Sequence, residues 1–202
     1  MSIFTKIFND QDLDALNNTV RWNRLPRHVN ESVAHHSFLV VLFTRIICEE
    51  INLHPEGTLS AVTHAIFHDF SEIFEGDVLH NVKYNNYNGE QIRKELEDYT
   101  KISAKAKFPG DSKGDSLFYN SISAPPSDFV KTIVKLADWL SMSFYCLKET
   151  RMGNTNFDKP LLYCDKGVNK TAALLHEKLD QNKAALYNPT ILKELQEWTS
   201  KN

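Results

Sequence analysis

The chain has 202 residues, 42% of them hydrophobic and 24% charged, as is typical of one globular domain with its own core. A formal net charge of -3 without any basic block argues against long-range attraction to a nucleic acid polymer or an anionic membrane. Three cysteines without CxxC spacing, no signal peptide and no long apolar run indicate a cytoplasmic protein without disulfides or a membrane span.

Helical periodicity runs through nearly the whole chain, and neither a repeat nor a convincing strand is found. A short first helix, capped by Asp10 or Asp12, is expected to end near Arg21. The later predicted helices cover about residues 32–52, 58–75, 89–105, 127–150, 168–186 and 190–201. Between them, proline and glycine predict loops at residues 23–29, 77–88, 107–126 and 151–167. This pattern predicts a single all-α domain, in which residues 107–126 are long enough to form a flap.

The central stretch His64–Asp77 mixes histidines and carboxylates with apolar side chains. On one continuous helix, His68 and Glu72 lie one above the other, His64 lies on the same face, and Asp69 reaches Glu72. Burying such a set without partners would cost several kcal/mol. We therefore expect it to bind a divalent cation.

Four residues in helices with strong apolar stripes form the candidate metal set: His36, His68, Asp69 and Asp138. Nitrogen and oxygen ligands without sulfur favour Mn²⁺, Co²⁺, Fe²⁺ or Zn²⁺, whereas Mg²⁺ prefers an all-oxygen shell. Two alternatives stay open at this point. His64 and His68 alone would be close enough on a helix to hold the metal, and Asp138 would also be satisfied by a buried arginine.

Several short motifs resemble those of the small bacterial HD-domain 5′-deoxynucleotidases and of the phage enzymes that strip triphosphate from dATP. The motifs are R-W at 21–22, E-S-V-A-H-H-S at 31–37, H-D-F-S-E-I-F-E-G-D at 68–77 and V-K-Y at 82–84. The resemblance runs from residue 21 to about 140. It implies a single HD domain over 1–202, with a helical core at about 21–150 on which the helices at 168–201 pack.

The resemblance also implies roles for individual residues. The x-H-S motif selects His36 rather than His35 as a metal ligand, beside His68, Asp69 and Asp138. Glu72 takes the place of the catalytic carboxylate. The substrate contacts implied are Arg21 and Lys83 for phosphate, and Trp22 and Asp77 for deoxyribose.

Together these observations predict a metal-dependent phosphohydrolase that removes the 5′ phosphate from deoxynucleoside monophosphates. The main alternative is a deoxynucleoside triphosphohydrolase, because the two reactions share the same ligands. A hydrolase of signalling nucleotides and a non-catalytic helical regulatory module are further alternatives. The expected partner is a small deoxynucleotide, and the resemblance implies a homodimer.

Overall fold

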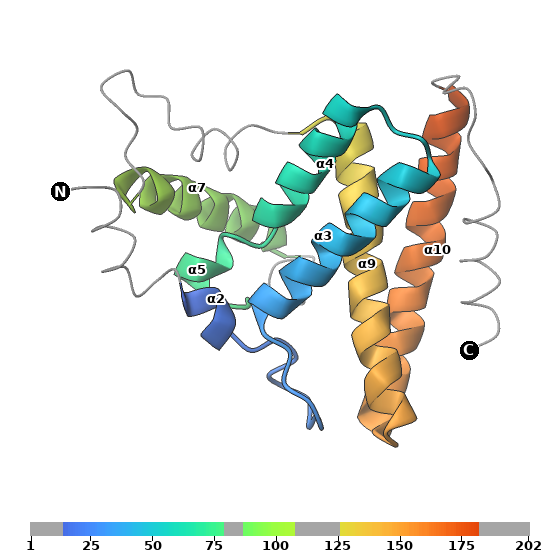
Figure 1. Cartoon of the computed structure of the whole chain (residues 1–202). Coiled ribbons are helices and arrows are strands. Elements are labelled where there is room, and N and C mark those ends of the chain that lie inside the picture. Colours follow the sequence, from blue (N-terminus) through green and yellow to red (C-terminus); the bar gives the residue numbers. More distant parts are fainter. Residues whose placement is uncertain (1–13, 79–86, 108–125, 182–202) are drawn as a thin grey trace. The chain divides into compact units, whose positions relative to one another are not determined.

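The computed structural model describes residues 14–78, 87–107 and 126–181, and Figure 1 shows its helices in chain order. The helices are α2 (Ala15–Asn18), α3 (Val33–Glu50), α4 (Pro55–Phe67), α5 (Glu72–Glu75), α7 (Gly89–Lys107), α9 (Asp128–Arg151), the 3-10 helix η2 (Thr155–Phe157) and α10 (Asp158–Gln181). Within these ranges, pairing of extended backbone is limited to one isolated bridge between Val20 and Ser32. The all-α prediction is confirmed. Among the helices of the described ranges, none has the length and hydropathy needed to span a lipid bilayer.

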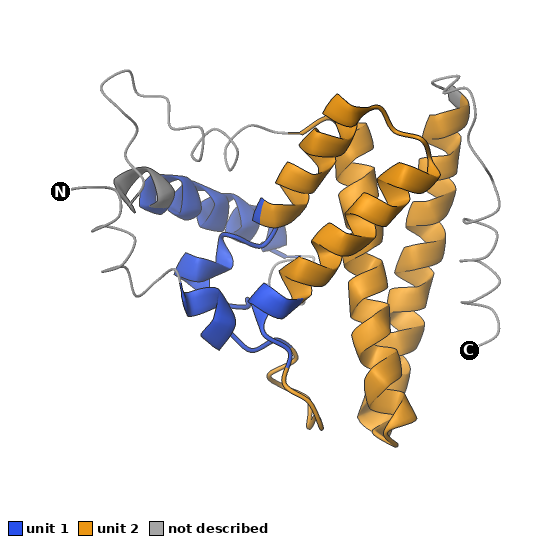
Figure 2. Cartoon of the chain, viewed as in Figure 1, with its two compact units in different colours: residues 1–21, 31–35, 67–125 blue, residues 22–30, 36–66, 126–202 orange. Residues whose placement is uncertain are grey.

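The chain forms two compact units, coloured separately in Figure 2. Unit 1 comprises residues 1–21, 31–35 and 67–125, and unit 2 comprises residues 22–30, 36–66 and 126–202. The chain therefore passes between the units several times, and three of these points follow Arg21, His35 and Ile66. Each unit is described by itself below.

Unit 2 is built around α9, which packs along α10. Ser127 begins α9 as predicted, because its hydroxyl accepts the Val130 N–H at 3.2 Å. The buried residues of α9 recur at helical spacing and pack with apolar residues of α3, α4 and α10 in one core cluster. A second cluster near the end of α9 contains Tyr145, Phe157 and Cys164.

The prediction of a loop over 151–167 is wrong, since α10 begins at Asp158. Pro160 and Gly167 suggested loop, yet both fit this helix. Pro160 stands in the first turn, where a proline breaks no internal hydrogen bond. Gly167 lies against the Trp139 ring of α9, and a methyl group at this position would overlap the ring. Close helix packing, rather than a break in the helix, explains this glycine.

The central helix is a second departure from prediction, because it is not continuous. It begins at Pro55, where the His54 imidazole accepts the Gly57 N–H at 3.1 Å, and α4 ends at Phe67. Around residues 68–71 the backbone N–H groups bond to carbonyls three residues earlier, as in a 3-10 turn. One example is the hydrogen bond from Phe70 N–H to Phe67 C=O. Edge-to-face contacts of Phe70 with Phe67 and Phe74 accompany this turn. His68 and Asp69 therefore lie in a turn, and not on one helix face with His64 and Glu72.

Some predictions concern residues outside the described ranges. They are the caps Asp10 and Asp12, the phosphate contact Lys83, most of the flap over 107–126 and the last helix at 190–201. The remaining boundaries agree closely with prediction. In particular, α3 begins after Ser32, whose hydroxyl accepts the His35 N–H at 3.2 Å.

Candidate active site

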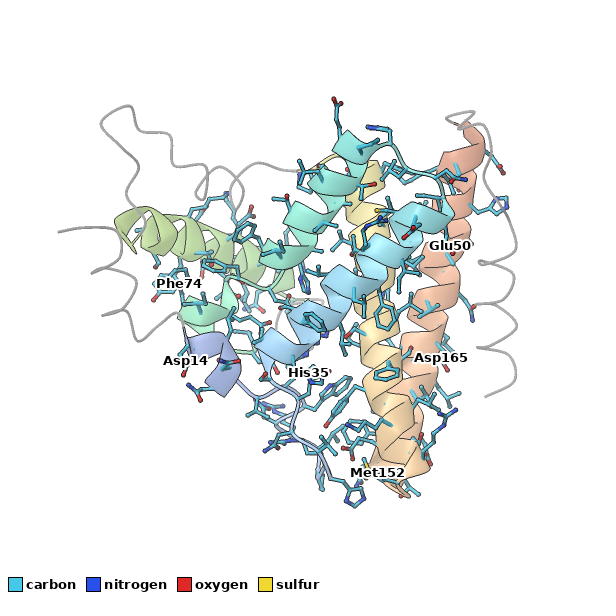
Figure 3. The ribbon with its side chains drawn as sticks, viewed as in Figure 1. Asp14, His35, Glu50, Phe74, Met152 and Asp165 are labelled. Carbon is cyan, nitrogen blue, oxygen red and sulfur yellow. The ribbon has the colours of Figure 1, made fainter. Side chains whose placement is uncertain are left out.

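In unit 2, His36 of α3 and Asp138 of α9 form a buried pair. His36 is 0% exposed, and its Nε2 lies 3.2 Å from Asp138 Oδ1. On the other side of the ring, Nδ1 lies 3.0 Å from the Ser141 hydroxyl. His35, labelled in Figure 3 in the first turn of α3, is exposed. Burial thus separates the two adjacent histidines and favours His36 as the inward-facing one.

The surroundings of His36 suit a metal ligand. When the Nδ1 proton is donated to Ser141, Nε2 presents its lone pair on the side of the Asp138 carboxylate. Two electron-rich atoms then face each other, and a bound cation satisfies both. The second carboxylate oxygen, Oδ2, accepts from Lys135 Nζ at 2.7 Å. Asp138 is therefore paired with a lysine of its own helix.

In unit 1, His68, Asp69 and Arg21 lie together. Asp69 Oδ2 is 3.2 Å from His68 Nε2 and 3.0 Å from Arg21 Nη1. Arg21 Nε also lies 3.5 Å from an oxygen of the buried Glu31 carboxylate. The Arg21 N–H donates to the Glu31 carbonyl at 2.9 Å, so both backbone and side chain hold Arg21 beside Glu31. This arrangement presents an imidazole, a carboxylate and a guanidinium within one turn-rich region.

Glu72 follows as the first residue of α5 and is 5% exposed. Its N–H donates to the Asp69 carbonyl at 3.0 Å, which joins it to the turn that carries His68 and Asp69. Gly76 ends α5 with a φ of 69°, as its sequence position predicts. Asp77 comes next and is half-buried.

Trp22, the first residue of the loop 22–30 in unit 2, adopts a φ of 58°, which is unusual for a residue with a bulky side chain. Its ring stacks on Tyr145, with ring centres 5.8 Å apart and planes at 11°. It also meets the edge of Phe157 at 5.6 Å. The Trp22 ring is therefore held by aromatic neighbours from α9 and η2.

Sequence reasoning assigned no role to three residues that contact the predicted site. Ser141 and Lys135 lie three residues to either side of Asp138, a spacing that places them on its helix face. Glu31 belongs to a quoted motif, but its contact with Arg21 depends on the bridge between Val20 and Ser32. The spacing around Asp138 was a usable signal, whereas the pairing of Glu31 with Arg21 required the folded chain.

Comparison with known proteins identifies the class. The fold is similar to that of an HD-domain phosphohydrolase from Listeria innocua, with a TM-score of 0.66, 20% identity, and coverage of 95% of this chain and 89% of the other. It is also similar to the HD phosphohydrolase of cyanophage S-2L, solved with dA and one catalytic Zn²⁺, with a TM-score of 0.55, 14% identity, and coverage of 100% and 96%.

The family model for the YfbR-like 5′-deoxynucleotidases matches residues 11–191, and the chain belongs to this family. A 5′-deoxynucleotidase of Shewanella oneidensis is 37% identical over 150 residues, which cover 68% of this chain and 72% of the relative. A 5′-deoxynucleotidase of Pasteurella multocida is 30% identical over 148 residues, which cover 72% and 75%. The predicted resemblance is confirmed: the protein is a hydrolase of the YfbR-like 5′-deoxynucleotidase family, and its fold is similar to that of HD phosphohydrolases.

Proposed function

We propose that the protein hydrolyses the 5′ phosphate of deoxynucleoside monophosphates with a divalent metal bound by His36, His68, Asp69 and Asp138. The observation that carries this proposal is the buried His36–Asp138 pair, whose imidazole is oriented by Ser141. A second histidine–carboxylate pair, His68–Asp69, has the same spacing of 3.2 Å in unit 1. Membership of the 5′-deoxynucleotidase family supports joining the two pairs in one centre.

Two imidazole nitrogens and two carboxylates are a donor set for Co²⁺, Mn²⁺, Zn²⁺ or Fe²⁺ rather than for Mg²⁺. The Zn²⁺ in the cyanophage enzyme, whose fold is similar, supports a metal of this kind. When bound, such an ion lowers the pKa of water and offsets negative charge at phosphorus.

Protein groups perform the remaining steps. Glu72 orients the attacking water, accepts its proton and returns a proton to the leaving 5′ oxygen. Its burial and its backbone bond to Asp69 keep the carboxylate close to the turn that carries two ligands. Arg21 binds phosphate oxygens through its planar set of donors, which the Glu31 contact orients.

The sugar is recognised by Trp22 and Asp77. Trp22 offers a flat apolar surface that suits the unsubstituted 2′ carbon of deoxyribose, and Asp77 accepts a hydrogen bond from a sugar hydroxyl. Lys83, which lies outside the described residues, is proposed as a further phosphate contact.

Product analysis tests the proposal. The protein is reconstituted with Co²⁺ or Mn²⁺ and incubated with dAMP, AMP and dATP, and chromatography resolves nucleosides, nucleotides and phosphates. We expect deoxyadenosine and orthophosphate from dAMP and much slower release from AMP. Triphosphate release from dATP with intact dAMP would instead establish a triphosphohydrolase. Absence of hydrolysis in all three reactions with full metal loading would overturn the proposed function.

A further inference from the structure

A buried carboxylate that the proposed chemistry does not use lies in the last turns of α9. Glu149 is 0% exposed, and its side chain accepts hydrogen bonds from the N–H groups of His28 at 2.9 Å and Val29 at 2.9 Å. Asn154 Nδ2 donates at 2.7 Å and the Tyr145 hydroxyl lies at 3.4 Å. Two of these donors are backbone groups of the loop 22–30, which begins with Trp22.

The charge of Glu149 is stabilised by this arrangement. Burial alone raises the pKa of Glu149, but the His28 N–H, the Asn154 amide and the Val29 N–H outweigh burial and hold the pKa below its ordinary value. The side chain is therefore ionised at neutral pH. A buried anion with several donors is a strong local anchor, because each donor would lose a charged acceptor if the loop moved away.

The residues that surround Glu149 hold the loop at further points. Asn154 Nδ2 also donates to the Pro26 carbonyl at 2.9 Å, and the Tyr145 hydroxyl donates to the Val29 carbonyl at 2.6 Å. Tyr145 is also the residue on which the Trp22 ring stacks. One small network therefore binds the end of the loop and supports the aromatic side chain at its beginning.

The backbone of Trp22 explains why the loop needs an anchor. A φ of 58° is disfavoured for tryptophan, and such a conformation persists only where the surroundings impose it. Inside the loop, the Trp22 carbonyl accepts from Leu25 N–H at 3.0 Å and from Arg27 Nη1 at 3.3 Å. These bonds close the turn at the beginning of the loop, and Glu149 attaches the end of the loop, at His28 and Val29, to α9.

We propose that Glu149 is a positioning residue that holds loop 22–30 so that Trp22 discriminates deoxyribose from ribose. This inference rests on the proposed function, because it assigns Trp22 to the sugar. Glu149 does not touch the substrate in this scheme and acts through the loop backbone and Tyr145. Loss of its charge shifts the Trp22 ring and reduces the preference for dAMP over AMP.

Substitution Glu149→Gln tests this role, because glutamine keeps the shape of the side chain but removes its charge. It also replaces one acceptor oxygen with an NH₂ group, which cannot accept a hydrogen bond from the loop N–H groups. The matched control is Asp165→Asn. Asp165, labelled on α10 in Figure 3, is another buried carboxylate of unit 2, and it accepts from the Ser143 hydroxyl at 3.0 Å. Trp22→Phe reports the contribution of the tryptophan itself.

The decisive measurement is the ratio of kcat/KM for dAMP to kcat/KM for AMP. We expect Glu149→Gln to lower this ratio by roughly tenfold, mainly through KM for dAMP, and Asp165→Asn to leave it unchanged. In the double variant with Trp22→Phe, the loss should be no larger than in Trp22→Phe alone, since both changes act on one contact. An equal fall in both kcat/KM values, or additive losses, would overturn the inference.

Two further measurements separate this inference from the proposed function. Equilibrium binding of dAMP and AMP gives the sugar preference without turnover, and amide hydrogen exchange reports the protection of His28 and Val29. A wild-type protein that binds dAMP preferentially but releases no phosphate would overturn the proposed hydrolysis alone. Unchanged preference and unchanged exchange in Glu149→Gln would overturn the positioning role alone.

A milder variant keeps the inference testable if Glu149→Gln does not fold. Tyr145→Phe keeps the ring under Trp22 but removes the hydroxyl that bonds Val29 and contacts Glu149. We expect a smaller fall of the same ratio, and a ratio equal to that of the wild type would contradict the role of this network.

Discussion

Asp138 and Asp69, both proposed as metal ligands, lie in different kinds of secondary structure. Asp138 is in the middle of the 24-residue α9, next to the fully buried Ala137, and its two oxygens face His36 and Lys135. Asp69 lies in the turn between α4 and α5, is more exposed, and is oriented by Arg21. The packed helix determines the direction of one carboxylate, whereas side-chain partners determine the direction of the other.

The difference suggests a division of tasks. A long helix packed on several partners would hold its proposed ligand in a constant place. The short turn instead joins a proposed ligand, Asp69, to the proposed catalytic Glu72 through the backbone and to Arg21 through an ion pair. We therefore expect substitutions along the turn to affect turnover and substrate binding, and substitutions along α9 to affect metal binding and stability.

The largest expected effect is in the turn. Glu72→Gln should lower kcat by about 10²–10⁴-fold, because glutamine cannot exchange a proton with water or the leaving oxygen. Metal content and unfolding temperature should stay close to those of the wild type. Steady-state kinetics with dAMP and metal analysis by mass spectrometry check this.

The matched control is Glu75→Gln on the same short helix, where Ser71 Oγ donates to the Glu75 carboxylate at 2.7 Å. This variant should retain most of the activity. Equal rates for the two variants would remove Glu72 from the proposed mechanism.

The second prediction compares the two aspartates directly. Asp138→Asn should weaken metal binding by more than about 100-fold, because it removes a ligand, and even substitutions of residues that only orient a ligand cost 10–100-fold. Asp69→Asn should also weaken metal binding, and should raise KM because Arg21 loses an ionic partner. Titration with Co²⁺ followed by kinetics separates the two. Full metal occupancy in Asp138→Asn would contradict its assignment as a ligand.

A smaller effect is expected where α10 supports α9. Gly167→Ala places a methyl group into the Trp139 ring, and overpacking of this kind costs about 1–3 kcal/mol. Denaturant unfolding measures the free energy, with exposed Lys166→Ala as the control in the same helix. We expect the folded variant to keep its KM for dAMP, since the turn of unit 1 is not altered. A stability equal to that of the wild type would show that α9 and α10 adjust easily.

The smallest effect concerns acid stability and contrasts two buried carboxylates of unit 2. The pKa of Glu149 is lowered in the folded protein, so its stabilising contribution is present above the unfolded pKa and is lost as pH falls through the folded pKa. For Asp165, burial raises the pKa despite the Ser143 bond, so protonation on acidification favours the folded state.

Glu149→Gln should therefore flatten the acid side of the stability curve, and Asp165→Asn should steepen it. Chemical unfolding between about pH 3 and pH 7 checks both. Parallel curves for wild type and Glu149→Gln would show that the folded pKa of Glu149 is not lowered.

Local sequence signals predicted much of the helical framework, because capping and apolar periodicity act over a few residues. Ser32 and Ser127 begin α3 and α9 as predicted, and Gly76 ends α5. The start of α10 was missed because Pro160 and Gly167 are loop signals in the local sequence. In the folded chain, the same residues fit a packed helix. Only the position of Trp139 shows why glycine is needed there.

The candidate site divides in the same way. The amino-acid pattern was enough to propose which residue types carry the chemistry, because buried His, Asp and Glu among apolar residues need a cation or donors. The folded chain was needed to show that His36 faces inward between Ser141 and Asp138, that Arg21 pairs with Glu31 and that Glu149 anchors the loop of Trp22. These contacts join residues that lie up to 121 positions apart in the chain. Local patterns do not encode such distances, since packing of whole helices sets them.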